Sequence, residues 1–203
     1  AVSDWIPLSP TTAEPDGRFP GARYGANFIA LDSNHFLLYG GVGPGGGTYG
    51  EWWIYDATTN EWDDLTNPVG IPGERFRGFA AGAGFNGDAY VFGCNDAAGN
   101  PSNVLGFYDY GGGNTNAWTE AQPTFGGPPA MTFASLERVN TELGLTQMLL
   151  FGGVRNQFGQ LTYSDETWLI GNLAQFPLTV SRVSNGLGDV SPPARGRHAS
   201  VSF

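Results

Sequence analysis

The sequence predicts an all-β protein made of four-stranded antiparallel sheets that stack on one another. The first observation is that its apolar runs are five to eight residues long, too short for helices, and are bounded by turn residues. The second is that glycine accounts for 32 of the 203 residues, roughly twice its ordinary share. The third is that the order of the runs repeats along the chain, as it does in proteins built from stacked structural repeats.

The second run of each repeat is the easiest to recognise. "FLLYGG" at residues 36–41 returns as "AYVFGC" at 89–94 and as "MLLFGG" at 148–153. The first glycines after these runs lie 53 and 59 residues apart. Each run is rich in aromatic and aliphatic residues, so each is predicted to be a strand that ends in glycine.

The other runs follow in the same order. "EWWIYD" at 51–56 matches "LGFYDY" at 105–110 and "ETWLIG" at 166–171, and "TNEWDDL" at 59–65 matches "TNAWTEA" at 115–121. An apolar first run precedes each unit and returns once more near the end of the chain, at residues 22–31, 75–85, 129–139 and 196–203. The sequence therefore contains three full units and a fragment at each end.

Tight turns are predicted between the runs of one unit. Asn86-Gly87 is a strong hairpin signal, because both central residues of such a turn need positive φ. "DATTNEW" at 56–62 is predicted to join the third and fourth strands, with Asp56 accepting backbone N–H groups of the turn. Each unit is thus a four-stranded meander, which must stack on a neighbour to bury both of its faces.

These residues together resemble the kelch repeat of the galactose oxidase and kelch superfamily. The first unit carries its pattern of a strand ending in two glycines, an aromatic-Asp pair and a Thr-Asn-x-Trp turn, at Gly40-Gly41, Tyr55-Asp56 and Trp62. The resemblance covers nearly the whole chain and implies a kelch-type β-propeller with four-stranded antiparallel blades.

The second unit keeps most of this pattern. It has Gly93, Tyr108-Asp109 and Trp118, but Cys94 stands in place of the second glycine. The resemblance implies that the glycines end the second strand where blades crowd together, and that Trp118, like the tryptophan of the first unit, packs between blades.

The third unit departs further from the pattern. It keeps Gly152-Gly153, but Ile170-Gly171 replaces the aromatic-Asp pair and the fourth strand has no tryptophan. The resemblance implies one propeller domain, or part of one, over residues 1–203. Its blades would span residues 22–70, 74–127 and 128–185, with a lone fourth strand at 4–8 and a lone first strand at 198–203.

The three complete blades leave two sheet edges and two apolar faces open. We therefore expect the chain to belong to a longer polypeptide, or a neighbouring subunit to complete the ring. A small closed propeller of four blades is the alternative.

Charge excludes some partners. The net charge is −10, so nucleic acid and anionic membrane surfaces are not expected to bind. No apolar stretch approaches the roughly 18 residues of a membrane span. The acidic charge, the lack of lysine and a first residue other than Met favour a secreted or cell-surface protein, with a cytoplasmic one as the alternative.

No metal or cofactor is expected. Cys94 is the only cysteine, so no internal disulfide can form, and His35 and His198 are the only histidines. His35 is predicted in an exposed turn. "NDAAGN" at 95–100 lacks the spacing of a calcium loop. Galactose oxidase-type copper chemistry is not implied either, because the lone cysteine stands at a packing glycine.

No catalytic residues are predicted, and the expected site is a binding face. Asp63 and Asp64 point to opposite faces of a strand, so they do not form a carboxylate pair. In a kelch fold the loops that join second to third strands, and those that join blades, emerge on one face: residues 42–50, 94–103, 154–165, 66–75, 122–129 and 184–195. The candidate binding residues on that face are Tyr49, Arg75, Arg155, Phe158 and Tyr163.

The sequence therefore predicts a non-enzymatic module for protein interaction or assembly that uses the loop face. The alternative is a carbohydrate-binding or carbohydrate-active propeller, because exposed aromatic rings and arginines also suit a glycan.

Overall fold

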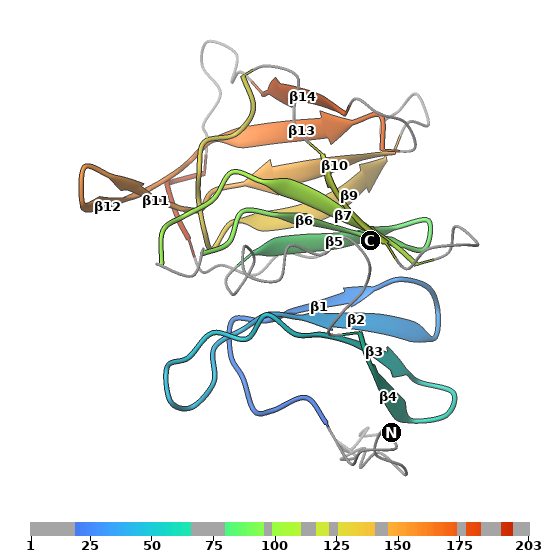
Figure 1. Ribbon diagram of the computed structural model, residues 1–203. Coiled ribbons are helices and arrows are strands. Elements are labelled where there is room, and N and C mark those ends of the chain that lie inside the picture. The colour runs from blue at the N-terminus through green and yellow to red at the C-terminus, as the bar shows by residue number, and fades with distance from the viewer. Residues whose placement is uncertain are drawn as a thin grey trace, which may run out of the picture.

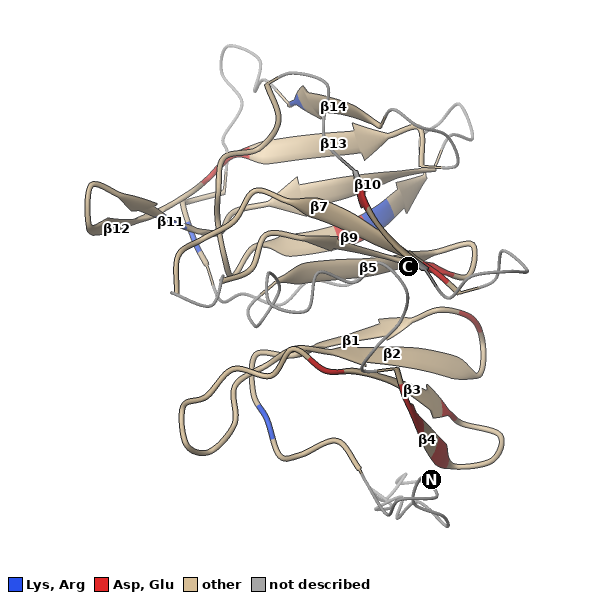
Figure 2. Cartoon of the chain, viewed as in Figure 1, with Lys and Arg blue, Asp and Glu red and all other residues tan. Residues whose placement is uncertain are grey.

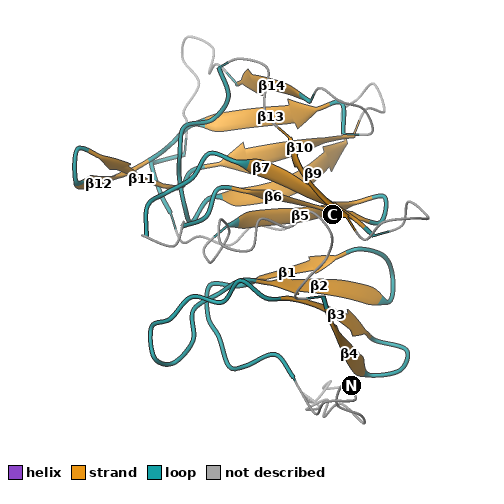
Figure 3. Ribbon diagram, viewed as in Figure 1, coloured by secondary structure: helices purple, strands orange, loops and turns teal. Residues whose placement is uncertain are grey.

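The computed structural model describes residues 19–65, 80–95, 99–110, 117–121, 126–140, 146–173, 178–183 and 192–196. Over these residues the chain is all-β, with 14 strands and no helix (Figure 3). The described residues accordingly hold no helix of the length and apolarity that a membrane crossing requires. Arg75, His198 and the strands predicted at 4–8 and 198–203 lie outside the described residues.

Twelve strands form three four-stranded antiparallel sheets, and each sheet falls within one predicted unit. Sheet I contains β1 (Asn27–Ala30), β2 (His35–Tyr39), β3 (Trp52–Asp56) and β4 (Glu61–Asp64). Sheet II contains β5 (Ala81–Phe85), β6 (Asp88–Phe92), β7 (Leu105–Asp109) and β8 (Ala117–Ala121). Sheet III contains β9 (Ser135–Asn140), β10 (Thr146–Phe151), β13 (Thr167–Gly171) and β14 (Thr179–Arg182).

Sheet II lies between the other two sheets (Figure 1). One apolar core joins sheets I and II and includes Leu37, Trp52 and Tyr108. A second core joins sheets II and III and includes Tyr90 and Leu150. The first strands β1, β5 and β9 contact one another in sequence, so the sheets stack with their first strands side by side.

The approach between first strands requires glycine. A Cβ atom at Gly84 in β5 would lie 1.9 Å from the carbonyl oxygen of Ala30 in β1. A Cβ atom at Gly82 would lie 2.5 Å from Cδ1 of Ile29. The "AGAGF" sequence of β5 therefore lets its backbone pack directly on sheet I.

The same backbone hydrogen bonds recur where each second strand ends. The N–H of the first glycine after each second strand donates to the carbonyl of the residue just before the third strand. These pairs are Gly40 to Glu51, Gly93 to Val104 and Gly152 to Glu166. The carbonyl of the residue after that glycine accepts an N–H from the connecting loop, at Gly41 from Tyr49, at Cys94 from Ser102 and at Gly153 from Ser164. The three units are thus equivalent in backbone geometry as well as in sequence.

Two predicted turns are confirmed. Asn86 and Gly87 have φ values of 55° and 89°, as the β5–β6 hairpin requires. In the β3–β4 turn, Asp56 accepts the N–H of Thr58 at 2.7 Å. Asn60 has a φ of 59° there, and its side chain accepts the hydroxyl of Tyr55 at 2.8 Å.

One predicted loop has more structure than expected. Residues 154–165 contain the hairpin of β11 (Val154–Gln157) and β12 (Gln160–Tyr163), which forms a separate two-stranded sheet. Its turn residues Phe158 and Gly159 have φ values of 52° and 80°. Phenylalanine is an unusual choice for positive φ, so the pattern gave little indication of this turn.

The packing of the two repeat tryptophans differs from the expectation in one case. Trp118 is 5 % exposed and lies between sheets I and II, with its ring 5.1 Å from that of Trp52. Trp62 is only half-buried, and its described ring contacts are Phe28 and Tyr55 of its own sheet. It therefore lies on the outer face of sheet I and not between two of the described sheets.

Candidate functional site

The connections between second and third strands emerge on one side of the molecule, which we call the loop side (Figure 1). It carries residues 40–51, the described residues 93–95 and 99–104, and the β11–β12 hairpin. The segment that leads into β9 joins this side as well, because Met131 donates its N–H to the carbonyl of Ser102 at 3.0 Å. The β1–β2, β3–β4 and β5–β6 turns lie at the opposite end of the sheets, where acidic residues gather (Figure 2).

A groove of about 1050 Å³ opens where the first strands meet the loop side. Residues of β1, β5 and β9 line it together with the segments before β1 and β9 and the β11–β12 hairpin. The lining therefore combines all three sheets, although each sheet is a separate part of the sequence.

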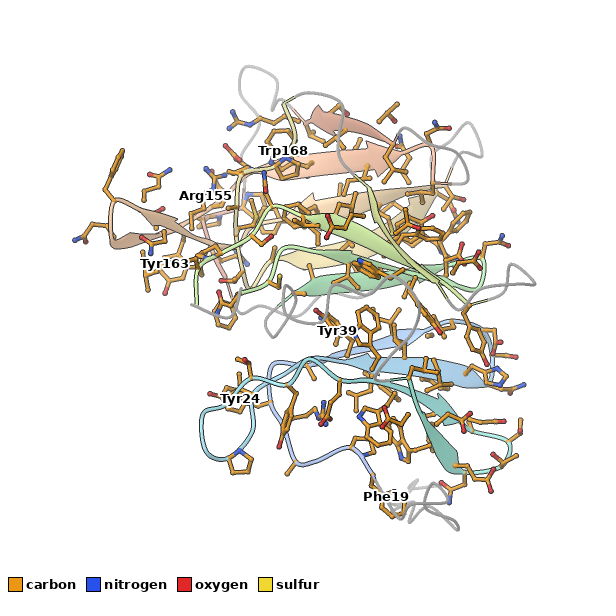
Figure 4. The ribbon with its side chains drawn as sticks, in the orientation of Figure 1. Phe19, Tyr24, Tyr39, Arg155, Tyr163 and Trp168 are labelled. Atoms are coloured by element: carbon orange, nitrogen blue, oxygen red, sulfur yellow. The ribbon has the colours of Figure 1, made fainter. Side chains whose placement is uncertain are left out.

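The side chains in this groove are suited to hydrogen bonding and ring stacking. Asn27, Asn95 and Asn156 provide side-chain amides, each with donors and an acceptor. Tyr24 and Tyr163 are 62 % and 60 % exposed, so both rings present surface that a ligand could contact. Figure 4 shows them on the same side of the molecule, Tyr24 before β1 and Tyr163 at the end of β12.

Ionisable groups are sparse in the groove. Among its described lining residues, Glu137 is the one carboxylate, and no arginine or histidine is present. These residues therefore offer amides, hydroxyls and apolar surface to a ligand, rather than a pair of groups for general acid–base chemistry.

Of the four predicted binding residues that the structure describes, Tyr163 alone lines the groove. Phe158 is fully exposed at the tip of the β11–β12 hairpin, outside the groove. Both belong to the β11–β12 hairpin on the loop side, but only Tyr163 lines the groove.

Arg155 of β11 is engaged at the base of the β11–β12 hairpin, next to sheet III. Its guanidinium pairs with the carboxylate of Glu166 and donates to the hydroxyl of Ser164 at 2.9 Å. The same carboxylate accepts the indole N–H of Trp168 at 3.2 Å, and its other oxygen lies 3.1 Å from Arg182. Arg155 thus holds the hairpin against the start of β13, and its exposed fraction is only 17 %.

Tyr49 takes part in an equivalent cluster of sheet I. The guanidinium of Arg23 lies 4.2 Å from the centre of its ring and 2.6 Å from Glu51. Glu51 also accepts the indole N–H of Trp53 at 3.1 Å. Since Glu51 and Glu166 occupy equivalent positions, each glutamate ties an arginine and a third-strand tryptophan to the loop side.

The groove also contains residues that the sequence did not single out. Tyr24 comes from the segment before β1, and the others from three strands, β1, β11 and β12: Asn27, Asn156 and Leu161. The stacking of the sheets brings them together. Polar and aromatic residues alternate around Asn27 and around Tyr163, which could have indicated a binding site. The same alternation is typical of ordinary strand ends.

His35 lies in a polar cluster rather than on an open turn. Its Nδ1 is 2.8 Å from Asp32 and its Nε2 is 3.7 Å from Asp56, while its ring lies 5.3 Å from that of Tyr110. The backbone N–H of Asn34 helps to lower the pKa of Asp32, and hydrogen bonds from Thr58 lower the pKa of Asp56. The two carboxylates flank opposite ring nitrogens, and no group of His, Cys, Asp and Glu in the described residues is arranged to hold a metal ion.

In comparisons with known proteins, no family model and no curated protein matches this sequence. The resemblance to the kelch repeat therefore rests on the residues of the chain itself.

Proposed function

We propose that this chain is a kelch-type β-propeller segment whose loop side binds a protein partner without catalysing a reaction. The propeller is supported by three equivalent four-stranded meanders whose first strands lie side by side around a groove. Support for the binding role comes from the loop side itself.

One observation carries the proposed binding role: large apolar side chains are exposed together on the loop side. Tyr24, Leu161 and Tyr163 are 62 %, 70 % and 60 % exposed along the groove, and Phe158 stands fully exposed beside it. Exposed aromatic groups that cluster on one face are typical of protein interfaces, where tyrosine often contributes much of the binding energy. Asparagine amides in the groove would add hydrogen bonds to a partner backbone.

Affinity capture with matched variants tests this proposal. The double variant Tyr24→Ala/Tyr163→Ala should lose a partner that the wild-type chain retains, because its stacking surface is removed. Thr58→Ala, at an exposed turn on the opposite end of sheet I, is the control and should retain the partner. Equal retention by both variants would place the interface elsewhere on the molecule and overturn the assignment.

A carbohydrate ligand is the second candidate. The combination of exposed tyrosine rings with side-chain amides in one groove also fits a sugar, whose C–H faces stack on aromatic rings and whose hydroxyls bond to amides. A glycan array followed by titration calorimetry distinguishes the two. Saccharide binding that Asn27→Ala weakens, with no captured protein, would favour the glycan.

A further inference from the structure

The outer face of sheet I carries a row of aromatic side chains, one from each strand. Phe28 of β1 stacks on Phe36 of β2 with ring centres 5.3 Å apart and planes inclined by 13°. Tyr55 of β3 lies 6.5 Å from Phe36 and 5.0 Å from Trp62 of β4. The row remains accessible, since Phe28 is 56 % exposed and the other three rings are half-buried.

The equivalent positions of sheets II and III are covered. Strand register places Phe36 in the position of Ala89 and Met148, both 0 % exposed. It places Phe28 in the position of Leu136, which is 2 % exposed against the sheet before it. Tyr55 and Trp62 likewise correspond to Tyr108 and Trp118, which are 0 % and 5 % exposed. Sheets II and III bury this face against a preceding sheet, whereas in sheet I these four rings remain accessible. Trp53 lies on the same face nearer the loop side and is 2 % exposed.

The surface that covers such a face belongs to the opposite side of the preceding sheet. Sheet I covers sheet II with Leu37, Tyr39 and Ile54. Sheet II covers sheet III with Tyr90 and Phe92.

Sheet III has the same surface without a following sheet among the described residues. Leu149, Phe151 and Leu169 occupy these positions in its register, and all three are only half-buried. The described residues therefore present both halves of one repeating interface, the first on sheet I and the second on sheet III.

We propose that a second copy of this chain docks the outer face of its sheet III on the aromatic face of sheet I. With two copies related by a twofold axis, both open faces are covered at once and the contact closes on itself. The occupant is thus a four-stranded sheet whose aliphatic and aromatic side chains repeat the interfaces already formed inside one chain. This proposal does not rest on the ligand that the loop side binds, although Phe28 also lines the groove, whereas Leu169 and Ser181 are not among its lining residues.

The chain itself offers a partial cover at sheet III. Arg195 bonds to Gly153 and Ser164 as Met131 bonds to Cys94 and Ser102, so residues 192–196 run where the segment into a following sheet would run. One further strand would lie over β9, as β5 lies over β1, and would leave the side chains of β10 and β13 open. A complete cover needs a whole sheet, which a second copy supplies.

Sedimentation velocity on single-face variants tests the proposal. The wild-type chain should sediment with twice the 21.6 kDa mass of one chain. Phe28→Lys on sheet I and Leu169→Lys on sheet III should each sediment as monomers, because a charge on either face disrupts both contacts of a twofold pair. Ser181→Lys, at an exposed position opposite Leu169, is the second sheet III variant if Leu169→Lys does not fold. Phe158→Lys, at the hairpin tip, is the control and should remain dimeric.

Mixing the two monomeric variants makes the test specific. An equimolar mixture holds one intact sheet III face and one intact sheet I face, so it should recover the dimer mass. A wild-type chain that stays monomeric at high concentration would overturn the proposal and show that the chain covers its own faces. Dimers that only Phe28→Lys disrupts would also overturn it, because they would pair sheet I with sheet I.

Discussion

Cys94 shows how a backbone conformation persists when its usual residue is replaced. Its φ is 122°, close to the 100° and 106° of Gly41 and Gly153 at the equivalent positions. The thiol is fully buried in the core between sheets I and II. A residue with a side chain is strained at such a φ, so this position carries a cost that its counterparts avoid.

The Cys94→Gly variant should be more stable than the Cys94→Ala variant. Both substitutions remove the thiol, but only glycine relieves the backbone strain. The free energy of unfolding of Cys94→Gly should therefore be about 1–2 kcal/mol higher than that of Cys94→Ala. At Ala83, a buried strand residue whose φ is not positive, Ala83→Gly should instead lower stability by about 1 kcal/mol. Urea denaturation of the variants measures both differences, and the same sign at the two sites would contradict the argument.

The close approach of β5 to β1 gives a second test at single-residue scale. Gly84→Ala places a Cβ atom where the Ala30 carbonyl oxygen now lies 1.9 Å away, so the two sheets must move apart. The expected loss is about 3 kcal/mol of unfolding free energy or more, at the upper end for overpacked sites. Gly47→Ala is the matched control, because its added Cβ meets no atom within 4 Å and its stability should change by less than about 0.5 kcal/mol. Equal midpoints in urea would mean that the first strands do not pack directly.

At the scale of elements, the sequence predicted most strands and missed one hairpin. The second and third strands were predictable because they are short aromatic and aliphatic runs, and each second run ends in glycine. The turn at Asn86 was predictable because its residues tolerate positive φ. The β11–β12 hairpin was missed because Phe158 holds a positive φ that its side chain disfavours.

The candidate site was only partly predictable, for a different reason. The loop side followed from the order of strands, and Tyr163 with it. The pairing of Arg155 with Glu166 removed one predicted ligand-binding group, because a guanidinium near a buried carboxylate bonds to it. The groove residues Asn27 and Asn156 come together only because sheet I packs on sheet II and sheet II on sheet III, an arrangement that no local pattern specifies.

The β5–β6 hairpin carries a pH-dependent cost. Burial, together with the nearby charge of Asp109, raises the pKa of Asp88 from 3.8 to about 6. An acid whose folded pKa is raised keeps its proton in the folded state after the unfolded chain has lost it. Stability therefore falls as pH rises through the window from about 4 to 6 and remains lower above it.

Asp88→Asn should remove this cost. The variant should be more stable than the wild type at pH 7, and the difference should vanish below about pH 3, where both states of the wild type hold the proton. The side-chain oxygen of asparagine keeps an acceptor for the Tyr110 N–H. Asp63→Asn, on an exposed position of β4, removes the same charge and should not reproduce the gain. Urea midpoints across this pH range decide between the two outcomes.

At the scale of the whole molecule, the stacking order sets which side chains hold the sheets together. Sheet II is covered on both faces. In the described residues, sheets I and III are each covered by a neighbouring sheet on one face only. Residues on the two faces of sheet I should therefore contribute unequally to folding, even where the residue type is the same.

Trp52 and Trp62 allow a direct comparison within sheet I. Trp52 is 1 % exposed between sheets I and II and contacts the rings of Tyr39, Tyr108 and Trp118. Trp52→Ala should lower the unfolding free energy by roughly 3–5 kcal/mol, the range for a large side chain deleted from a core. Trp62→Ala should cost only about 1–2 kcal/mol when measured on dilute monomer, because its ring is half-buried on the outer face.

Denaturation at rising protein concentration separates folding from assembly. If a second copy buries the outer face, the loss of stability in Trp62→Ala should increase with protein concentration. The loss in Trp52→Ala should stay the same. A concentration-independent loss as large as that of Trp52→Ala would show that Trp62 already lies in a core within one chain.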